Sequence, residues 1–382
     1  MTRTNNLGLY VHVPFCVRKC AYCDFLSFAC REEAVLTEYA KALSRDIALK
    51  GELKPYRTTD TVYIGGGTPS LLSPADINLI MESVYYNFNV ADDAEITIEA
   101  NPATLNEEKL RAYRAAGINR ISIGVQSFDN TVLNRLGRIH DKNDALNAIR
   151  LAQKAGFDNI SIDLMFAIPG QTEKMWRDTV RQAIFTGVSH ISLYSLQIEE
   201  NTPMWDMVEA GTITPTEAEA DREMYHMALD MMRGAGYYQY EISNAAVPGR
   251  ESRHNLKYWS YQEYIGAGTG ASSFVDGRRY SNYSKMLTYL DAVKKGRPTG
   301  DVEQVDEFST REEMGIYVFT GLRKVAGIDM RDFEEVFGMD FFSVYDPEII
   351  RKYKGYMEYD GSVLKLTEAG MDISNRIMSE FV

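Results

Sequence analysis

The chain has 382 residues, of which 45% are hydrophobic and 25% are charged, and its formal net charge is −13. This composition fits a soluble globular protein with a large buried core, and the length suits an α/β barrel with an appendage. The negative charge argues against nucleic-acid binding, and the sequence predicts neither a transmembrane helix nor a signal peptide.

Short β-branched runs alternate with segments of helical periodicity along the first 245 residues. We expect strands at 9–13, 61–65, 95–100, 120–125, 159–165 and 190–196, with a seventh candidate at 237–242. Helical patterns lie between them at 34–49, 74–86, 107–116, 145–155 and 172–185. Nearly continuous apolar strands separated by helices predict a parallel sheet covered on its outer side. The predicted fold class is therefore α/β, an incomplete (β/α)6 barrel rather than a closed eightfold one.

The unusual residues of the chain follow these strands directly. Cys16, Cys20 and Cys23 come after the first strand, the sequence GGGTPS (65–70) after the second, and Asn101 after the third. Gln126 follows the fourth strand, and IPGQT (168–172) follows the fifth. Because ligands of such sheets bind beyond the carboxyl ends of the strands, we expect these residues to meet at one rim.

The pattern changes after residue 250. Segment 252–274 is rich in aromatic residues, glycine and polar residues, and it reads as a long loop. Helical patterns at 307–322, 330–337 and 342–354 predict a small, mostly helical C-terminal domain. We therefore expect a partial barrel (1–245) with a cysteine-bearing loop at 14–28, an aromatic and glycine-rich connecting region (246–306), and a helical domain (307–382).

All four cysteines lie between positions 16 and 30, and three of them have the spacing C-x3-C-x2-C. Without a secretion signal, this clustering indicates metal or redox chemistry in a reducing compartment. Three thiolates can hold three corners of an iron–sulfur cubane and leave the fourth iron open. A structural zinc site completed by His12 is the alternative, and Cys30 is interpreted as a free, partly buried thiol.

The polar residues of the rim suggest a ligand. Three successive glycines leave backbone groups unshielded, so that a small polar ligand can pair with them, although a simple turn is the competing interpretation. Glu99 could accept hydrogen bonds from an ammonium group or hydroxyls. Gln126, Arg138 and Asp163 add neutral, cationic and anionic groups on the same side. Each alone could be structural, but together they fit a zwitterionic, ribose-bearing ligand.

The motifs YVHVPFCVRKCAYCDF, GGGTPS, IEANP, GVQSF and DLMFAIPGQT together resemble the radical S-adenosylmethionine superfamily. Over most of the chain the pattern is similar to the branch that contains oxygen-independent coproporphyrinogen III oxidase and HemW-type heme chaperones. The resemblance implies that Cys16, Cys20 and Cys23 bind a 4Fe–4S cluster whose fourth iron is chelated by S-adenosylmethionine. It also implies a set of residues that contact this ligand, namely Tyr10, Tyr22, Gly66, Gly67, Thr68, Glu99, Gln126, Arg138 and Asp163.

Two departures argue against the oxidase. Its cluster motif continues to a further cysteine where this chain has Phe25, and it carries a long extension before the cluster loop. The pattern HNxxYW instead resembles the chaperones, and it supplies the heme candidates His254, Asn255, Tyr258 and Trp259. Imidazole is a common axial ligand of heme iron, and the aromatic rings offer flat apolar surface. A satisfied turn is the alternative, and Cys30, His12, His140, His190 and His226 are weaker candidates.

The resulting hypothesis is a cytoplasmic heme chaperone that binds heme and passes it to apo-hemoproteins. No catalytic residue is assigned. The alternatives are a coproporphyrinogen oxidase or another enzyme that modifies tetrapyrroles, such as a heme-degrading methyltransferase. A homodimer formed through the cluster loop, a peripheral association with the inner face of the membrane and the use of radical chemistry stay open.

Overall fold

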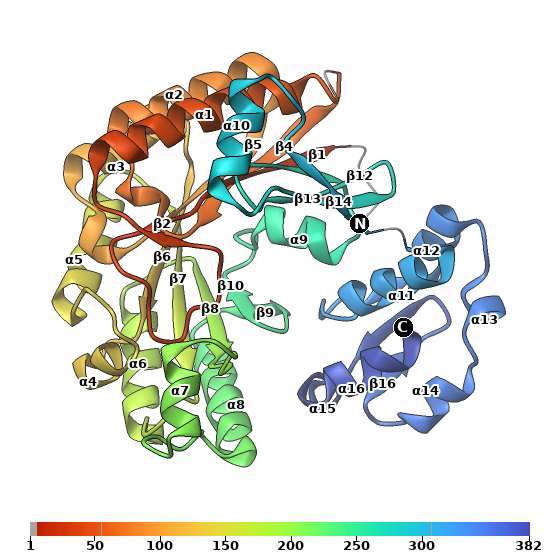
Figure 1. Cartoon of the computed structure of the whole chain (residues 1–382). Coiled ribbons are helices and arrows are strands. Elements are labelled where there is room, and N and C mark those ends of the chain that lie inside the picture. Colours follow the sequence, from red (N-terminus) through yellow and green to blue (C-terminus); the bar gives the residue numbers. More distant parts are fainter. Residues whose placement is uncertain (1–5, 55, 307) are drawn as a thin grey trace.

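A twelve-stranded sheet is the framework of the larger part of the molecule (Figure 1). The computed structural model describes residues 6–54, 56–306 and 308–382, so the expected boundary at residue 307 and the first five residues lie outside the described part. The strands of this sheet are β1 (Leu7–Val13), β4 (Thr58–Gly66), β5 (Asn89–Ala100), β6 (Arg120–Gln126), β7 (Asn159–Phe166), β8 (His190–Ser195), β9 (Tyr238–Glu241), β10 (Asn244–Ala246), β11 (Tyr264–Ala267), β12 (Ser272–Val275), β13 (Arg278–Asn282) and β14 (Gly300–Asp306).

The strand order is β14-β13-β12-β11-β1-β4-β5-β6-β7-β8-β10-β9. The strands from β11 to β8 pair parallel, and those at both ends pair antiparallel. All six expected strands are present, and the seventh candidate coincides with β9. Because β14 and β9 end the order without pairing with each other, the barrel is incomplete, as expected.

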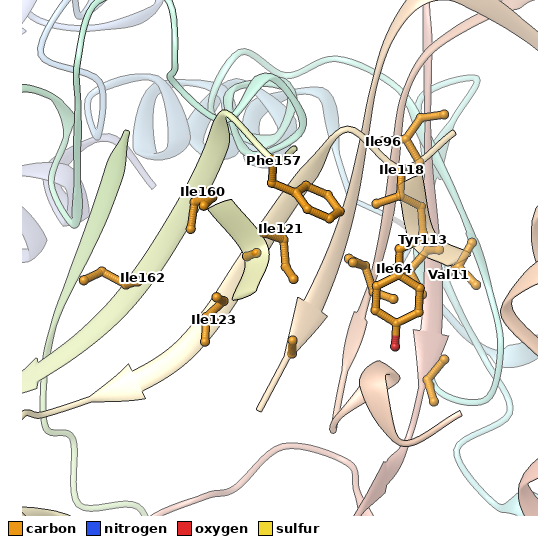
Figure 2. Close-up of a cluster of buried hydrophobic side chains, with 14 of the residues drawn as sticks. Val11, Ile64, Ile96, Tyr113, Ile118, Ile121, Ile123, Phe157, Ile160 and Ile162 are labelled. Carbon is orange, nitrogen blue, oxygen red and sulfur yellow. The ribbon is translucent and has the colours of Figure 1, made fainter. Parts of the chain in front are cut away.

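Helices cover the outer face of the sheet, where the apolar side chains point. Figure 2 shows isoleucines of β4, β5, β6 and β7 packed with Tyr113 and Phe157, which are buried. The opposite face of the same strands carries polar residues such as Thr61, Tyr63 and Glu99, as the two-residue period of a strand requires. The helices of this part are α1 (Glu33–Gly51), α2 (Pro74–Asn87), α3 (Glu107–Ala115), α4 (Asn130–Arg135), α5 (Lys142–Lys154), α6 (Glu173–Phe185), α7 (Pro203–Glu209), α8 (Ala218–Gly234), α9 (Arg253–Trp259) and α10 (Met286–Lys294).

The expectation of a long loop at 252–274 is wrong, because α9, β11 and β12 lie there. Helix α9 begins after Ser252, whose side chain accepts a hydrogen bond from the backbone N–H of Asn255. The glycines of this segment allow close packing within a sheet: a Cβ on Gly266 would lie 2.3 Å from the carbonyl oxygen of Ser272. Residues that commonly mark loops therefore contribute a further parallel strand beside β1.

The C-terminal domain is mostly helical, as expected, and its buried core also includes Tyr261 and Phe274 of the larger part. Its helices are α11 (Thr310–Gly321), α12 (Met330–Phe337), α13 (Phe341–Val344), α14 (Glu348–Lys352), α15 (Glu368–Asp372) and α16 (Ser374–Met378). A small antiparallel sheet accompanies them, with the order β15 (Ile328–Asp329), β17 (Val363–Leu366) and β16 (Met357–Tyr359). The helix expected over 342–354 is split in two around Pro347, since the residue before a proline disfavours helical backbone.

Membrane-spanning helices are not found among the described residues, because none is both long and apolar enough.

Buried Asp46 of α1 connects this helix to three segments that follow β11 in the chain. Its carboxylate accepts hydrogen bonds from the backbone N–H of Gly268 at 2.8 Å, from Thr299 Oγ1 at 2.7 Å and from Tyr289 Oη at 3.0 Å. One turn later, the buried Lys50 Nζ donates to Asn282 Oδ1 at 2.8 Å. A single carboxylate thus satisfies donors from three segments that are far from it in sequence.

Replacing Asp46 by alanine should lower the free energy of unfolding by about 3 kcal/mol, because three buried donors lose their acceptor at once. Thermal or urea unfolding of the purified chain measures this loss. Asp291→Ala is the matched control on α10, since Asp291 makes only exposed ion pairs with Lys295 and Arg297 and should leave the transition nearly unchanged. Equal effects of the two substitutions would contradict the assigned role of Asp46.

Candidate functional site

A cavity of about 510 Å³ lies at the carboxyl ends of the parallel strands. The loop after β1 forms one wall, and the ends of β4 to β8 form the others. The cavity is lined by all but one of the residues expected to hold the cluster or S-adenosylmethionine, namely Cys16, Cys20, Cys23, Tyr22, Gly66, Gly67, Thr68, Glu99, Gln126, Arg138 and Asp163. These residues therefore meet at one rim, as we expected from their positions after the strands of a parallel sheet.

Tyr10 is the exception among the expected ligand contacts, because it does not line the cavity. Its ring packs 6.3 Å from the ring of Tyr63, and its hydroxyl lies 2.9 Å from His12 Nδ1. The side chain points along the inner face of β1, below the floor of the cavity.

The cluster loop, residues 14–30, is held by backbone contacts at several points. Cys16 lies in β2 (Phe15–Cys16), which pairs with β3 (Phe28–Ala29), and the Cys30 N–H donates to the Cys16 carbonyl at 2.9 Å. The Ala21 N–H donates to the carbonyl of Leu136 at 3.2 Å, and Arg18 Nη2 donates to the carbonyl of Gly137 at 2.7 Å. Backbone and guanidinium contacts therefore hold the loop in addition to the contacts made at its sulfur atoms.

The three expected ligand thiols are unpaired and partly buried, and all three border the same cavity. Burial raises the pKa of Cys16 and of Cys23. A bound metal reverses this preference, because it deprotonates the thiols that ligate it. The arrangement suits a cluster in which each thiolate binds a different iron.

A single-ion metal site has little support in the described residues, where no three His, Cys, Asp or Glu side chains converge on one point. His12, the candidate fourth zinc ligand, is occupied elsewhere. Its Nε2 lies 3.2 Å from the carbonyl of Leu26, which can only accept, so Nε2 carries the proton. Burial lowers the pKa of His12, and the remaining Nδ1 accepts from Tyr10. The zinc alternative therefore lacks its ligand.

Two polar side chains contact the ligand sulfurs. Arg138 Nη1 lies 3.4 Å from Cys20 Sγ, while its Nη2 donates to the carbonyl of Gly124 at 2.7 Å. Thr68 Oγ1 lies 3.5 Å from Cys16 Sγ and can donate to it. Hydrogen bonds to sulfur are among the features by which a protein adjusts the potential of an iron–sulfur cluster.

The glycines at the end of β4 have a structural role beside the ligand contact that we expect. The backbone N–H of Gly66 donates to Glu99 Oε2 at 3.0 Å, and that of Gly67 donates to the Val13 carbonyl at 2.9 Å. A Cβ on Gly67 would lie 2.7 Å from the carbonyl oxygen of Phe15. Gly66 has a φ of 116°, which side chains disfavour. These glycines allow the cluster loop to lie directly against the end of β4.

Glu99 and Asp163 place two carboxyl groups in the cavity wall. Tyr63 Oη donates to Glu99 Oε1 at 2.8 Å, and Ser122 Oγ donates to Asp163 Oδ1 at 3.3 Å. Burial raises the pKa of Glu99 from its ordinary value of 4.5 to about 7, and burial also raises the pKa of Asp163. At least one of these carboxyl groups can therefore change its charge near neutral pH.

The cavity also has residues that the sequence reasoning missed. Tyr194 and Ser195 end β8, Gln197 and Glu199 follow it, and Met165 comes from β7. The signal for them was available, because 190–196 was an expected strand and the rim rule applies to the residues at its end. Gln126, an expected residue, has a φ of 65°, which a non-glycine residue adopts mostly where function or packing holds it.

The HNxxYW residues do not line the cavity, and the structure does not fit His254 as a ligand for an external heme. His254 is completely buried, and its Nδ1 and Nε2 lie 2.8 Å from Thr61 Oγ1 and Tyr258 Oη. Burial lowers its pKa to about 3, so the ring is neutral and both nitrogens are engaged. Trp259 is covered by the guanidinium group of Arg323, 4.4 Å from the ring centroid. The backbone N–H of Asn255 is bound to the cap residue of α9.

The weaker iron candidates are also engaged within the fold. His190 contacts Ser161 and Tyr240, and Nε2 of His226 lies 2.9 Å from Asp372 Oδ2. His140 Nε2 donates to the carbonyl of Val125 at 3.0 Å, and burial lowers its pKa to about 4.

Comparison with known proteins gives consistent matches. The profile of the Radical SAM superfamily matches residues 10–183, and that of the HemN C-terminal domain matches residues 311–373. The protein named heme chaperone HemW of Bacillus subtilis is 35% identical over 98% of both chains. That of Lactococcus lactis is 33% identical over 98% of this chain and 96% of its own. That of Escherichia coli is 40% identical over 73% of each.

A solved structure has the same fold over the whole chain. Coproporphyrinogen III oxidase (HemN) from Escherichia coli has a TM-score of 0.86 at 22% identity, and the match covers 100% of this chain and 91% of that one. At this identity the likeness establishes the arrangement of the elements and nothing about the reaction.

The pKa of Glu99 leads to a prediction about stability. The folded state keeps the proton up to about pH 7, whereas the unfolded state loses it near pH 4.5, so wild-type stability should fall as the pH rises through this window. Glu99→Gln keeps a neutral group, and Tyr63 can accept from its amide. The variant should exceed wild type by up to about 3 kcal/mol at pH 8 and match it below pH 5. Thermal unfolding of the cluster-free chain at both pH values measures this, and parallel pH profiles would contradict it.

Proposed function

Because the chain belongs to the HemW family within the Radical SAM superfamily, we propose that it is a heme chaperone, which binds heme and delivers it to apo-hemoproteins. The observation that carries this proposal is the match to a protein of that name over 98% of both chains. Both parts of the relative, barrel and C-terminal domain, therefore have counterparts here.

The family implies a 4Fe–4S cluster and S-adenosylmethionine, and we assign them to the cavity. Cys16, Cys20 and Cys23 would hold the cluster. A reduced cluster bound there would be the source of an electron for cleavage of the sulfonium of S-adenosylmethionine. The expected contacts that line the cavity fit a ligand of that chemistry, because they offer both carboxylates and a guanidinium group beside the thiols.

The cavity residues have defined tasks in this proposal. Ionised Glu99 would accept from the ammonium group or hydroxyls of the ligand, in a site where burial strengthens such contacts. Arg138 would orient the cluster edge through Cys20, since it is itself anchored to the carbonyl of Gly124. The Thr68 hydroxyl would do the same at Cys16.

Phe25 supports the chaperone over the oxidase. Its side chain is 67% exposed and borders the cavity. The cluster motif of the oxidase branch has a cysteine at this position. An apolar ring at this position cannot supply the chemistry of a further cysteine, but it can contact a flat apolar ligand.

The competing function is oxidation or other modification of a tetrapyrrole. A cytoplasmic location, a peripheral contact with the inner face of the membrane and a dimer formed through the cluster loop also belong to the proposal. The exposed phenylalanines of the loop, Phe25 and Phe28, support a contact with a membrane surface or a second copy of the chain.

The proposal predicts a saturable, stoichiometric complex when heme is added to the anaerobically reconstituted chain, visible as a shifted Soret band. The complex should transfer its heme to an apo-hemoprotein faster than heme–albumin does under the same conditions. Absence of a saturable complex, or transfer no faster than from albumin, would contradict the chaperone function.

The alternative is tested in parallel. Incubation with reductant, S-adenosylmethionine and coproporphyrinogen III should yield no vinyl product, with the authentic oxidase as the positive control. Turnover of coproporphyrinogen, or ring-opened products from heme, would favour the enzyme instead.

A further inference from the structure

A column of stacked rings joins the cavity to helix α9 inside the partial barrel. It begins at the carboxylate of Glu99, which accepts from Tyr63 Oη at 2.8 Å. The Tyr63 ring stacks on His254 with centroids 5.2 Å apart and planes at 27°. His254 in turn contacts Tyr258, from Nε2 to Oη, at 2.8 Å. Part of the HNxxYW motif therefore lies two contacts away from a carboxylate of the cavity.

The helix that carries this column is anchored independently of it. Glu95 accepts from the backbone N–H groups of Arg253 and His254 at 3.2 and 3.1 Å, where the helix begins. Such a carboxylate is favourable at a helix N-terminus, whose first N–H groups lack partners. Lys257 Nζ forms a buried ion pair with Asp60 Oδ1 at 2.7 Å. His254 is therefore presented to Tyr63 by a fixed backbone.

Tyr63 has little freedom in this environment. Tyr10 packs on one side of it and His254 on the other, so the hydroxyl is directed to Glu99. Glu99 also accepts from Gly66 N–H, at the end of β4. The direction of the Glu99 carboxylate is thus determined by Gly66, which lines the cavity, and by Tyr63, which does not.

We propose that Tyr63 and His254 are positioning residues of the cavity, which hold the Glu99 carboxylate in the direction that its ligand requires. This rests on the proposed function, in which S-adenosylmethionine occupies the cavity. The proposal gives the HNxxYW motif a task inside the barrel: to support the ligand site from its floor.

The charged and titratable groups around Glu99 come from every neighbouring element. They are Tyr63 on β4, Arg120 on β6, Asp163 on β7, Tyr10 on β1, Tyr194 on β8 and Tyr258 on α9. The Tyr63 hydrogen bond favours the ionised carboxylate, whereas burial and Asp163 oppose it. Removing the hydroxyl should therefore raise the pH at which Glu99 ionises.

The chain contains a matched control for this arrangement. His190 and Tyr240 form another buried pair, with His190 Nδ1 2.7 Å from Ser161 Oγ and Nε2 2.8 Å from Tyr240 Oη. This pair has no hydrogen bond to Glu99. Tyr240→Phe thus removes a comparable hydroxyl, and with it a contact to the Ser252 N–H at the start of α9, while the hydrogen bonds among Glu99, Tyr63, His254 and Tyr258 stay in place.

The test measures S-adenosylmethionine binding to the full-length, anaerobically reconstituted chain between pH 6 and pH 8.5, normalised to iron content. Tyr63→Phe should raise the Kd about tenfold at pH 7 and move the pH midpoint of binding upward, as expected for a lost hydrogen bond to a charged group. His254→Ala should weaken binding in the same direction. Tyr240→Phe should bind as wild type does.

Several outcomes separate the possibilities. Equal Kd values for Tyr63→Phe and Tyr240→Phe would overturn the positioning role. The positioning role would also be overturned if the His254→Ala variant lost the Soret-shifted heme complex but bound S-adenosylmethionine as wild type does. If wild type binds no S-adenosylmethionine, the cofactor assignment itself fails, which is a different result. If Tyr63→Phe does not fold, Tyr258→Phe is the second variant, since it keeps every ring. It should raise the Kd for S-adenosylmethionine about threefold, because His254 loses its hydrogen bond to the Tyr258 hydroxyl.

Discussion

The close contact between the cluster loop and the glycine end of β4 determines where the other groups of the cavity lie. The backbone of Phe15 passes so near to Gly67 that no side chain fits between them, and the Gly67 N–H is bonded to the carbonyl of Val13. The thiols are therefore set against the same sheet edge that carries Glu99 and Gln126. A side chain at Gly67 would displace one wall of the cavity from the other.

The inner face of the sheet adds the second constraint, because it buries polar and ionisable groups that a barrel interior must satisfy. Hydroxyls of Thr61, Ser122 and Tyr63 are each paired with a histidine or a carboxylate. An incomplete network of buried polar groups lowers the stability of the folded state, whereas a complete one makes the interior rigid. The cavity is thus bordered below by side chains whose positions are mutually determined, which is what selective binding of a small charged ligand needs.

The strands and the rim could be predicted from the sequence because they depend on local patterns. Runs such as NISIDLM carry an apolar residue at every second position, and the residues after each parallel strand must meet at one edge. Helix α9 could not be predicted in this way, because its aromatic, glycine-rich surroundings also fit a loop, and its partners Thr61 and Glu95 are more than 150 residues away. The burial of His254 could not be predicted for the same reason. The role of Asp46 could not be predicted either, since its three donors lie beyond residue 260.

The backbone contacts of the cluster loop have a consequence for how the chain handles iron. In a small zinc domain the metal supplies the free energy of folding, so losing it unfolds the protein. Here Ala21 and Arg18 of the loop are bonded to Leu136 and Gly137 through backbone and guanidinium groups rather than through sulfur. Part of the free energy that brings the three thiols to the sheet edge therefore comes from the barrel itself and not from a metal that they bind.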